Sequence, residues 1–353
     1  MGETMEQGQY YFERAEDTGL GPVAQKPPVC LYLEVTNRCN LFCQTCPRTF
    51  ASVEKPADLS FERLQFLVDQ IEDLPIAVLH GIGEPMINRH LPKMIRYLKW
   101  RGTRVLFNSN ATLLNERLGR GLISAGLDEI RVSLDAADAE TFVRVRGLPK
   151  FDLILRNLKS FSTLKKKLQV KHPEVSLWLV GLRETIDELP AFVRLAHELE
   201  IKEVYLQRLV YFDDKQGSQG VARPEQALYG AMGEKESALI REAEQLGKEL
   251  GVTVTASGAT TPEQSLLPRT KDKPWSLCRR PWTLMYITAN GNVLPCCIAP
   301  FVERDYDRII LGNAFEKPLK EIFNSPRYQA FRRALLSDQP EHCCEGCGVR
   351  WSL

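Results

Sequence analysis

The segment Cys39-Asn40-Leu41-Phe42-Cys43-Gln44-Thr45-Cys46 places three cysteines at C-x3-C-x2-C spacing, directly after a mostly apolar run from Val29 to Val35. Clustered thiolates are soft ligands that suit iron–sulfur clusters, zinc or copper(I). A disulfide explains the loop poorly, because three is an odd number and the loop is short. A four-iron cluster takes four protein ligands, and zinc would also lack one, since the nearest histidine is His80. The spacing therefore predicts a cluster with one iron open to a ligand that the protein does not supply.

This loop resembles the hallmark of the radical S-adenosylmethionine (SAM) enzymes, in which C-x3-C-x2-C follows the first strand of a partial β/α barrel. The resemblance implies that Cys39, Cys43 and Cys46 hold a 4Fe–4S cluster whose open iron is chelated by the amino and carboxylate groups of SAM. Reduction of the cluster then cleaves SAM and yields a 5′-deoxyadenosyl radical. One residue departs from the family: the position before the third cysteine is often aromatic and touches adenine, and here it is Thr45.

Composition narrows the class of protein and its partners. The chain has 353 residues, 44% of them apolar, which is enough for one large domain and a small one. Lys plus Arg number 46 against 45 Asp plus Glu, a balance that argues against nucleic acid or an anionic membrane as the main partner. The polar start has no apolar segment typical of a secretory signal. Ten cysteines without such a signal indicate metal ligands in a reducing compartment, so we expect a cytoplasmic protein.

From Val29 onward, short apolar runs alternate with amphipathic segments, which is the pattern of a parallel sheet or barrel. There is no Rossmann fingerprint and no Walker lysine. These roughly six βα units fit the partial (β/α)6 barrel of the radical SAM family, so we expect an α/β fold with an N-terminal arm at 1–28, a barrel at 29–257 and a tail at 258–353. Strands are predicted at about 29–35, 76–79, 105–107, 130–134, 175–180, 204–210 and 252–256. Helices are predicted at about 60–73, 91–100, 114–125, 139–146, 152–168 and 189–199, with one long helix or two at about 225–250.

Polar segments follow four of the predicted strands: the cysteine loop, 83–85, 108–110 and 133–135. The carboxyl ends of parallel strands are where chemistry collects in β/α barrels. Each segment taken alone is also typical of a turn or a strand-end cap. Four of them at equivalent places favour a binding site.

The stretch Gly81-Ile82-Gly83-Glu84-Pro85 resembles the Gly-Gly-Glu-Pro motif of the radical SAM family. The resemblance implies that Glu84 and the nearby backbone at Gly83 hold the SAM ammonium, through charge-assisted hydrogen bonds. His80 precedes the motif, and we expect it to be a satisfied core histidine. The other residues that the resemblance assigns to SAM are Ser133 and Arg146 for the carboxylate (with Arg144 as the rival arginine), Asp135 and Asn110 near the ribose, and Gln207 with Leu206 near the adenine.

The pattern changes after Pro274, where the chain offers a second set of thiolates. Asn290-Gly291 between two apolar runs predicts a β-hairpin, and a helix is predicted at about 317–336. Four thiolates would complete either an iron–sulfur cluster or a structural zinc site; they are those of Cys278, Cys296, Cys344 and Cys347. Cys297 and Cys343 are spare neighbours, and the choice between Cys343 and Cys344 stays open, although C-x2-C spacing favours Cys344.

This tail resembles the SPASM/twitch domain that follows many radical SAM barrels, with C-x12-G-x4-C, the turn at 311–313, a helix and a terminal C-x2-C. The resemblance implies auxiliary iron–sulfur binding. Because few residues follow the last cysteine, we expect one auxiliary 4Fe–4S cluster.

The two resemblances imply a radical SAM enzyme that abstracts hydrogen from a substrate C–H bond, with an electron donor such as flavodoxin or ferredoxin. We favour two-electron oxidation of a small hydroxylated substrate, sugar- or cyclitol-like, with the tail cluster as electron acceptor. The single-cluster tail resembles that of the inosamine dehydrogenase of aminoglycoside pathways. We also expect no leader-binding domain before Val29, where peptide modifiers often carry one. The alternative is modification of a ribosomally made peptide by cross-linking or epimerisation. A non-catalytic zinc-binding scaffold would not need the strand-end segments.

Overall fold

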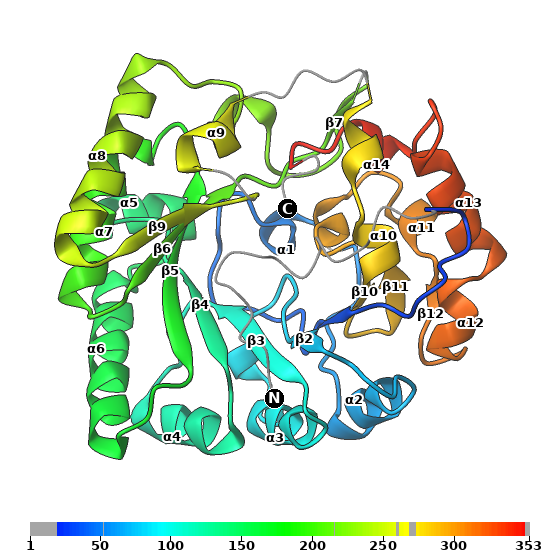
Figure 1. Cartoon of the computed structure of the whole chain (residues 1–353), viewed down its shortest axis with the longest axis horizontal. Coiled ribbons are helices and arrows are strands. Elements are labelled where there is room, and N and C mark those ends of the chain that lie inside the picture. Colours follow the sequence, from blue (N-terminus) through cyan, green and yellow to red (C-terminus); the bar gives the residue numbers. More distant parts are fainter. Residues whose placement is uncertain (1–19, 52, 215, 259–260, 268–272, 350–353) are drawn as a thin grey trace.

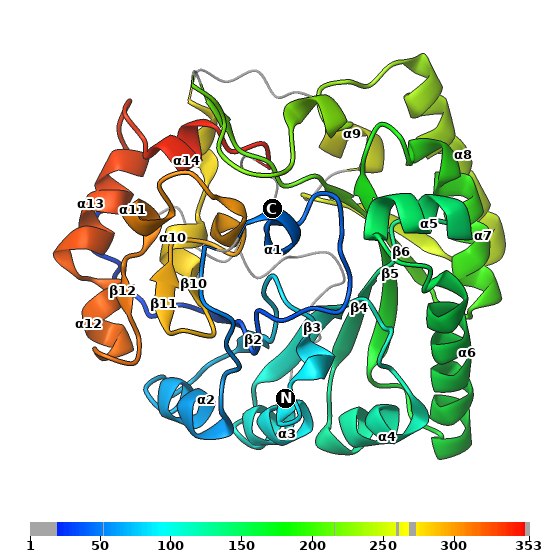
Figure 2. The ribbon, with the colours of Figure 1, turned by 180° about the vertical axis from the view of Figure 1, so that it is seen from behind.

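The computed structural model describes residues 20–51, 53–214, 216–258, 261–267 and 273–349. Within these ranges one large sheet has the strand order β12-β11-β10-β1-β2-β3-β4-β5-β6-β9, and β7 and β8 form a separate small hairpin. All neighbouring strands from β10 to β9 in this order run parallel to each other. At the other end, β11 pairs antiparallel with β10, and β12 pairs antiparallel with β11. The longer helices lie around the outer side of this curved sheet, as Figure 1 and the view from behind in Figure 2 show.

The barrel elements follow one another as alternating strands and helices. The strands are β1 (Cys30–Leu33), β2 (Ile76–Val78), β3 (Arg104–Ser109), β4 (Glu129–Ser133), β5 (Glu174–Gly181), β6 (Glu203–Arg208) and β9 (Thr253–Ala256). The helices are α1 (Pro47–Phe50), α2 (Phe61–Val68), α3 (Leu91–Trp100), α4 (Glu116–Ala125), α5 (Ala139–Arg146), α6 (Phe151–Leu168), α7 (Leu189–Glu198), α8 (Glu234–Leu250) and α9 (Pro262–Leu266). The small hairpin is β7 (Asp213–Asp214) and β8 (Gly217–Ser218).

The tail is built from shorter pieces. Its strands are β10 (Leu284–Ile287), β11 (Asn292–Leu294) and β12 (Gly312–Asn313), and its helices are α10 (Arg280–Thr283), α11 (Tyr306–Ile309), α12 (Leu319–Phe323), α13 (Pro326–Leu335) and α14 (His342–Glu345). The Asn-Gly turn makes the predicted hairpin, because Ile287 pairs with Val293 across it and Gly291 adopts φ +86°. A residue with a Cβ would be strained at that φ.

The helices predicted at 60–73 and 317–336 differ from the structure. The first ends earlier, at Val68. The second is two helices, because the Ser325 hydroxyl caps α13 by accepting a hydrogen bond from the Tyr328 N–H (3.2 Å) and Pro326 takes its first position. The segment at about 225–250, where one long helix or two were expected, holds a 3-10 helix at Pro224–Gln226 and α8 from Glu234. By contrast, the predicted cap at Ser60 is present and accepts a hydrogen bond from Arg63 N–H (3.2 Å).

The inner face of the sheet is only partly covered at the carboxyl ends of its strands. Residues that lie opposite each other on two paired strands point to the same face of the sheet. Asn108 lies opposite Arg131, and Val180 lies opposite Gln207. These side chains, like that of Ser133, are half-buried, whereas outward-pointing Ile130 and Val132 are fully buried under helices. The site therefore has to be sought on this half-open inner face.

The tail is joined to the barrel at both sides of the ring seen in Figure 1. On one side β10 pairs with β1 in parallel register, with Cys30 opposite Leu284. On the other side Phe212, in the loop after β6, forms a β-bridge with Cys347, and the Arg208 guanidinium donates to the Val349 carbonyl (3.1 Å). The tail thus bridges from the first barrel strand to the loop that follows the sixth.

The described part of the N-terminal arm lies against the tail helices. Ala24 N–H donates to Asn324 Oδ1 (2.9 Å), and Asn324 Nδ2 donates back to the Ala24 carbonyl (3.1 Å). The rest of the predicted arm, residues 1–19, lies outside the described residues. None of the described helices combines the length and the apolar composition needed to cross a bilayer.

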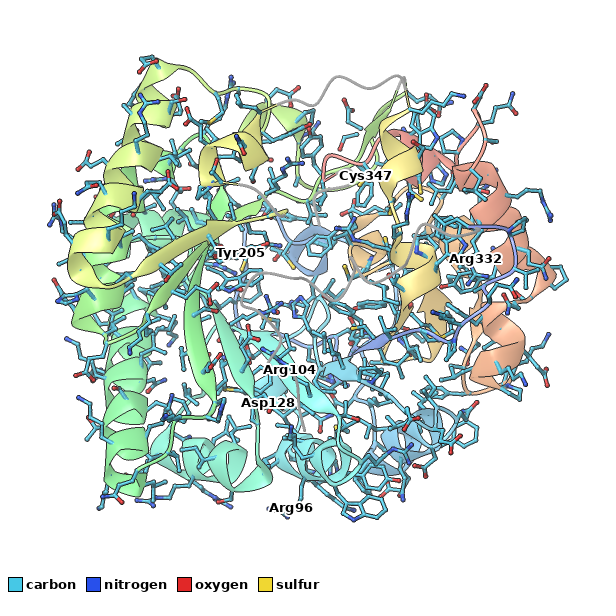
Figure 3. All side chains as sticks on the ribbon, viewed as in Figure 1. Arg96, Arg104, Asp128, Tyr205, Arg332 and Cys347 are labelled. Carbon is cyan, nitrogen blue, oxygen red and sulfur yellow. The ribbon has the colours of Figure 1, made fainter. Side chains whose placement is uncertain are left out.

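Arg332 is a buried cation that holds the arm and the tail together (Figure 3). Its guanidinium donates to the carbonyls of Pro281 (3.0 Å) and Pro22 (3.2 Å) and to Asn324 Oδ1 (2.9 Å). It also stacks 4.4 Å from the Phe323 ring centre and 4.3 Å from that of Tyr328. Burial lowers the pKa of Arg332 to about 10.

We predict that Arg332→Leu lowers the free energy of unfolding by about 3 kcal/mol, because three acceptors lose a charged donor inside the protein. Urea unfolding followed by circular dichroism measures the change. Arg333→Leu, on the exposed side of the same helix, is the matched control and should stay within about 0.5 kcal/mol of the wild type. Equal unfolding curves for the two variants would contradict the prediction.

Candidate functional site

The three cysteines of the first motif lie on the loop between β1 and α1, and all are half-buried. Burial raises the pKa of Cys46 to about 12 and that of Cys39 above its ordinary value. Thiolates at these positions therefore need a compensating positive charge, and bound iron supplies one.

The end of α5 holds this loop in place. Phe42 N–H donates to the Arg146 carbonyl (3.3 Å), and Gln44 N–H donates to the Val145 carbonyl (3.0 Å). Gly147 ends the helix with φ +82°, and a Cβ on it would lie only 2.4 Å from the Phe42 carbonyl oxygen. Only glycine fits this approach, so the cysteine loop and α5 are in direct backbone contact.

The glycine motif after β2 is packed against the same loop. A Cβ on Gly83 would lie 2.2 Å from the Thr36 carbonyl oxygen, and Glu84 N–H donates to the Arg38 carbonyl (2.8 Å). The backbone of this motif thus runs beside the chain that leads into Cys39. The structure brings the two predicted motifs together.

Glu84 is 2% exposed, and its carboxylate accepts three hydrogen bonds from the protein. The donors are Met86 N–H (3.1 Å), Ser109 Oγ (2.8 Å) and Asn110 N–H (2.7 Å). Burial raises the pKa of Glu84, and the three donors oppose that rise. A carboxylate has about four acceptor positions, so one remains for a further donor such as an ammonium group.

The side chain of Asn110 bridges the end of β3 and the cysteine loop. Its Nδ2 donates to Asn40 Oδ1 (2.9 Å) and lies 3.8 Å from the Cys39 sulfur, while its Oδ1 accepts from Thr112 N–H (3.0 Å). Asn110 therefore contacts the cysteine loop, which was expected at the same end of the sheet. Its predicted contact with ribose stays a prediction.

Asp135 and Arg146 form a buried ion pair next to the loop. Asp135 has φ +61°, and its Oδ1 accepts from Val180 N–H (2.8 Å). Arg146 Nη1 lies 3.4 Å from the Cys43 sulfur, and its Nε is buried with no hydrogen-bond partner among the described residues. The free Nε is a donor available to an anionic ligand. The rival Arg144 pairs with Glu184 (3.3 Å), which also accepts a hydrogen bond from the Gln44 side chain of the cysteine loop.

Ser133 and Gln207 lie where the sequence placed them, at the carboxyl ends of β4 and β6 on the half-open inner face. His80, in contrast, is not the satisfied core histidine that we expected. Its Nδ1 is buried without a hydrogen-bond partner among the described residues, and burial, with Arg131 nearby, lowers the pKa of His80 to about 4.

Glu34 is a site residue that the sequence analysis missed. It is 2% exposed and accepts hydrogen bonds from Ile82 N–H (3.1 Å), the Tyr286 hydroxyl (3.0 Å) and Ala289 N–H (3.1 Å). Burial raises the pKa of Glu34 to about 7. The available signal was an acidic residue inside the apolar run of the first strand, which is costly to bury unless it has partners.

The tail gathers its cysteines around one small pocket. Five of them line it, together with Phe212, Trp275 and the buried Arg280; they are Cys278, Cys296, Cys343, Cys344 and Cys347. The sulfurs of Cys343 and Cys344 are 4.0 Å apart, so the choice between them stays open. Cys297 does not line the pocket and interacts with Tyr32 on the barrel side. All cysteines are free thiols.

The donor set of both cysteine groups fits iron–sulfur clusters. Each group consists of free thiols, and cysteine thiolates are the ligands that hold such clusters. Within the described residues, no three Cys, His, Asp or Glu side chains are already arranged around a single metal position.

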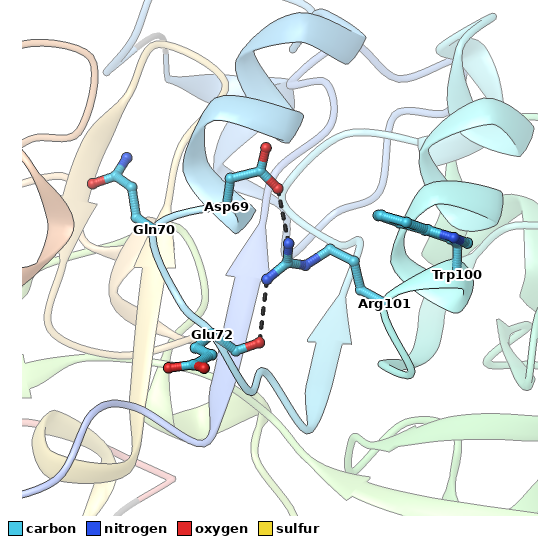
Figure 4. A pocket seen from close by; sticks show the side chains of 5 residues that line it. All are labelled: Asp69, Gln70, Glu72, Trp100 and Arg101. Atoms are coloured by element: carbon cyan, nitrogen blue, oxygen red, sulfur yellow. Dashed lines mark hydrogen bonds and ion pairs between the residues drawn. The ribbon is translucent and has the colours of Figure 1, made fainter.

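A surface hollow elsewhere in the molecule is unrelated to these groups. It is lined by Asp69, Gln70, Glu72, Trp100 and Arg101, which precede β2 and β3 and so lie at the opposite, amino ends of the strands (Figure 4). Arg101 is engaged there by Asp69 (2.9 Å) and by the carbonyls of Ile71 (2.6 Å) and Glu72 (3.2 Å). We assign it no ligand.

Comparison with known families agrees with both motifs. The family model of the radical SAM superfamily matches residues 33–196, and that of SPASM, an iron-sulfur cluster-binding domain, matches residues 278–348. The chain contains a radical SAM domain and, C-terminal to it, a SPASM domain. The predicted α/β fold and its cofactors are thereby confirmed: a SAM-binding 4Fe–4S cluster in the barrel and auxiliary iron–sulfur binding in the tail. The roles of individual residues stay predictions.

Similar proteins span several activities. Fe-coproporphyrin III synthase of Methanosarcina barkeri is 30% identical over 189 residues, 53% of this chain and 45% of that protein. PqqA peptide cyclase of Xanthomonas euvesicatoria is 23% identical over 327 residues, 92% of this chain and 81% of that protein. The chain thus spans less than half of the first of these relatives.

Among solved structures, SuiB of Streptococcus suis bound to S-adenosylmethionine has a TM-score of 0.67 at 19% identity, covering 91% of this chain and 73% of that chain. The SuiB complex with precursor peptide SuiA has a TM-score of 0.66 at 17% identity, covering 92% and 70%. At this identity the likeness shows the shared fold of barrel and tail.

We predict that Glu84→Gln weakens SAM binding about tenfold or more, because the remaining acceptor position loses its charge and an amide NH2 would face backbone N–H donors. Isothermal titration of the anaerobically reconstituted protein measures the dissociation constant. Glu62→Gln, exposed on α2, is the control with the same chemical change and should bind like the wild type. Overlaying isotherms for the Glu84 variant and the wild type would refute the assignment.

We also predict that the tail retains about four irons and four sulfides when Cys39, Cys43 and Cys46 are all changed to Ala. Metal and sulfide analysis of the anaerobically purified variant measures them. Zinc without sulfide would reject the cluster in the tail.

Proposed function

We propose that this protein cleaves SAM at its barrel cluster and uses the resulting 5′-deoxyadenosyl radical to modify a peptide. The observation that carries the first half is the three-thiolate loop, packed between the Glu84 and Arg146 networks at the carboxyl ends of the strands. When bound and reduced, the cluster supplies the electron that breaks a carbon–sulfur bond of SAM. The protein side of the site then has to bind, orient and enclose the reactants.

The residues divide these tasks by their free hydrogen-bonding capacity. Cys39, Cys43 and Cys46 would hold three irons, and the last acceptor position of Glu84 would take the SAM ammonium. The buried Nε of Arg146 would donate to the SAM carboxylate, and Ser133, at the end of β4, would be a second donor. Both Asp135 oxygens already have protein partners, so its clearest role is to orient Arg146.

The remaining predicted contacts involve less specific groups. Asn110 and Gln207 present amides to the same inner face and would contact the ribose and the adenine. The inner face between them also carries Trp178 stacked on Tyr205, with ring centres 4.0 Å apart. An aromatic stack beside amide and hydroxyl groups suits a substrate that combines apolar and polar parts, such as a peptide side chain and its backbone.

The comparisons support a peptide more than a small hydroxylated molecule. PqqA peptide cyclase aligns with nearly the whole chain, and SuiB, which shares the fold of barrel and tail, is known bound to a precursor peptide. The relatives reported above name a peptide or an iron porphyrin, and none of them a sugar or cyclitol. We therefore favour the peptide alternative over the small-molecule oxidation that the sequence analysis placed first.

The proposed reaction is still a net oxidation, but the molecule that is oxidised is a peptide. Joining two side chains of a peptide through a new bond removes two hydrogens, one taken by the radical and one lost as a proton with an electron. The tail cysteines would hold a cluster able to accept that electron, directly or as a relay, and they lie in a domain that pairs with both sides of the barrel. A reduced flavodoxin or ferredoxin would supply the electron for SAM cleavage.

The first step is tested by measuring 5′-deoxyadenosine after anaerobic reconstitution and reduction with dithionite in the presence of SAM. The wild type should form it, and the triple Cys39/Cys43/Cys46→Ala variant should fall to the level of the protein-free control. Cys30→Ala removes a thiol from β1 without touching the loop and should retain activity. Wild-type rates in the triple variant would sink the assignment of the barrel cluster.

The substrate is tested with three sets of candidates: peptides encoded beside the gene, iron coproporphyrin, and amino-sugars. We expect a peptide to stimulate 5′-deoxyadenosine formation and to lose the mass of two hydrogens for each new cross-link. If only the porphyrin or a sugar is consumed, the peptide proposal is wrong while SAM cleavage stands.

A further inference from the structure

One cation in the barrel contacts a predicted cluster ligand directly. Arg146 Nη1 lies 3.4 Å from the Cys43 sulfur, within hydrogen-bond range for a sulfur acceptor. By comparison, the amide of Asn110 stands 3.8 Å from the Cys39 sulfur and carries no charge. Among the described residues, Arg146 therefore supplies the charged hydrogen-bond donor to a cysteine of this loop.

The position of this guanidinium is fixed from several sides. Asp135 pairs with it through Oδ2, and Asp135 is itself held by Val180 N–H (2.8 Å) and by an unusual backbone conformation with φ +61°. The backbone of Arg146 is tied to the cysteine loop, because its carbonyl accepts from Phe42 N–H (3.3 Å). The side chains of Arg146 and Asp135 are 12% and 5% exposed, so water screens the contact little.

We infer that Arg146 is a positioning residue that sets the reduction potential of the barrel cluster through its hydrogen bond to Cys43. This inference rests on the proposed function, because it takes Cys43 as a ligand of that cluster. It goes beyond that function, since it concerns how easily the cluster accepts an electron and not how SAM is bound.

The sign of the effect follows from electrostatics. Reduction adds one negative charge to the cluster, and part of that charge resides on the thiolate sulfurs. A buried cation that donates to one of these sulfurs stabilises the reduced state more than the oxidised state. Hydrogen bonds to sulfur and local charge are among the factors that determine iron–sulfur potentials. Arg146 therefore makes the cluster easier to reduce, and its removal makes the potential more negative.

Asp135 explains how the Arg146 cation can stay buried beside Cys43, because the ion pair as a whole adds no net charge to the site. An isolated buried guanidinium would be costly, and a carboxylate partner offsets that cost. Asp135 takes one nitrogen of Arg146, which leaves Nη1 for Cys43 and Nε for a ligand. The pair is thus a fixed dipole with its positive end at the cysteine loop.

The test is a spectroscopic redox titration of the whole chain, reconstituted anaerobically and measured without SAM, so that any effect on SAM binding is excluded. The spectrum of the Cys39/Cys43/Cys46→Ala variant gives the contribution of the tail cluster for subtraction. In Arg146→Met the potential of the barrel cluster should become more negative than in the wild type. Arg144→Met, an arginine two residues away that pairs with Glu184, is the matched control and should keep the wild-type potential.

Arg146→Lys serves as a second variant that keeps the charge. A single ammonium group cannot reproduce the fork that contacts Asp135 and Cys43 together, so its potential should lie between those of Arg146→Met and the wild type. If Arg146→Met fails to assemble the cluster, the Arg146→Lys value decides alone. A wild-type potential in every variant that holds the cluster overturns the inference.

Different results would contradict the proposed function and the proposed role of Arg146. If the triple cysteine variant still cleaves SAM, the proposed function is wrong. If that variant is inactive but the potentials of the Arg146 variants are unchanged, the proposed function stands and only the role of Arg146 is wrong.

Discussion

The buried carboxylate of Glu34 is the contact on which the arrangement of barrel and tail depends. It lies at the end of β1, accepts from the glycine motif through Ile82 N–H, and accepts from the tail through Tyr286 and Ala289 N–H. A Cβ on Gly81 would come within 2.3 Å of this side chain, so the motif can approach only because that residue is glycine. One side chain therefore sets the relative positions of the glycine motif, the first strand and the tail hairpin. Charge without partners at this depth would be costly, which explains why three donors converge on it.

A second buried acid, Asp135, organises the other side of the cysteine loop. Its ion pair with Arg146 and the backbone contacts of α5 hold the loop from the side opposite to the glycine motif. Buried ion pairs contribute little net stability compared with apolar packing, but they fix geometry. The loop is thus clamped between two elements that are remote in sequence, and the three thiols are presented in a preset arrangement.

Local patterns in the sequence were enough for most elements and for recognising the two cysteine-containing domains. The cysteine spacing, the glycine motif and the Asn-Gly turn all depend on neighbours in the chain, and the structure places them as expected. The helix predicted at 317–336 failed because the cap at Ser325 and Pro326 was overlooked, which is also a local signal. The contacts of Glu34 with Tyr286 and of Arg146 with Cys43 join residues more than a hundred positions apart, and no pattern of single residues encodes such pairs. The same limit explains His80, whose missing partner becomes visible only when the surrounding strands are in place.

The parallel pairing of β10 with β1 has a consequence for how such proteins can be divided or recombined. All four residues of β1 are buried, and the strand lies directly between β10 of the tail and β2 of the barrel. Cutting the chain before the tail would turn β1 into an apolar edge with unpaired backbone groups, the kind of surface that pairs with other chains and aggregates. The tail is therefore not an appendage that a barrel can lose or exchange at its apparent boundary. An exchange between related enzymes would have to carry β10 with its own first strand, so that the sheet is inherited as one piece.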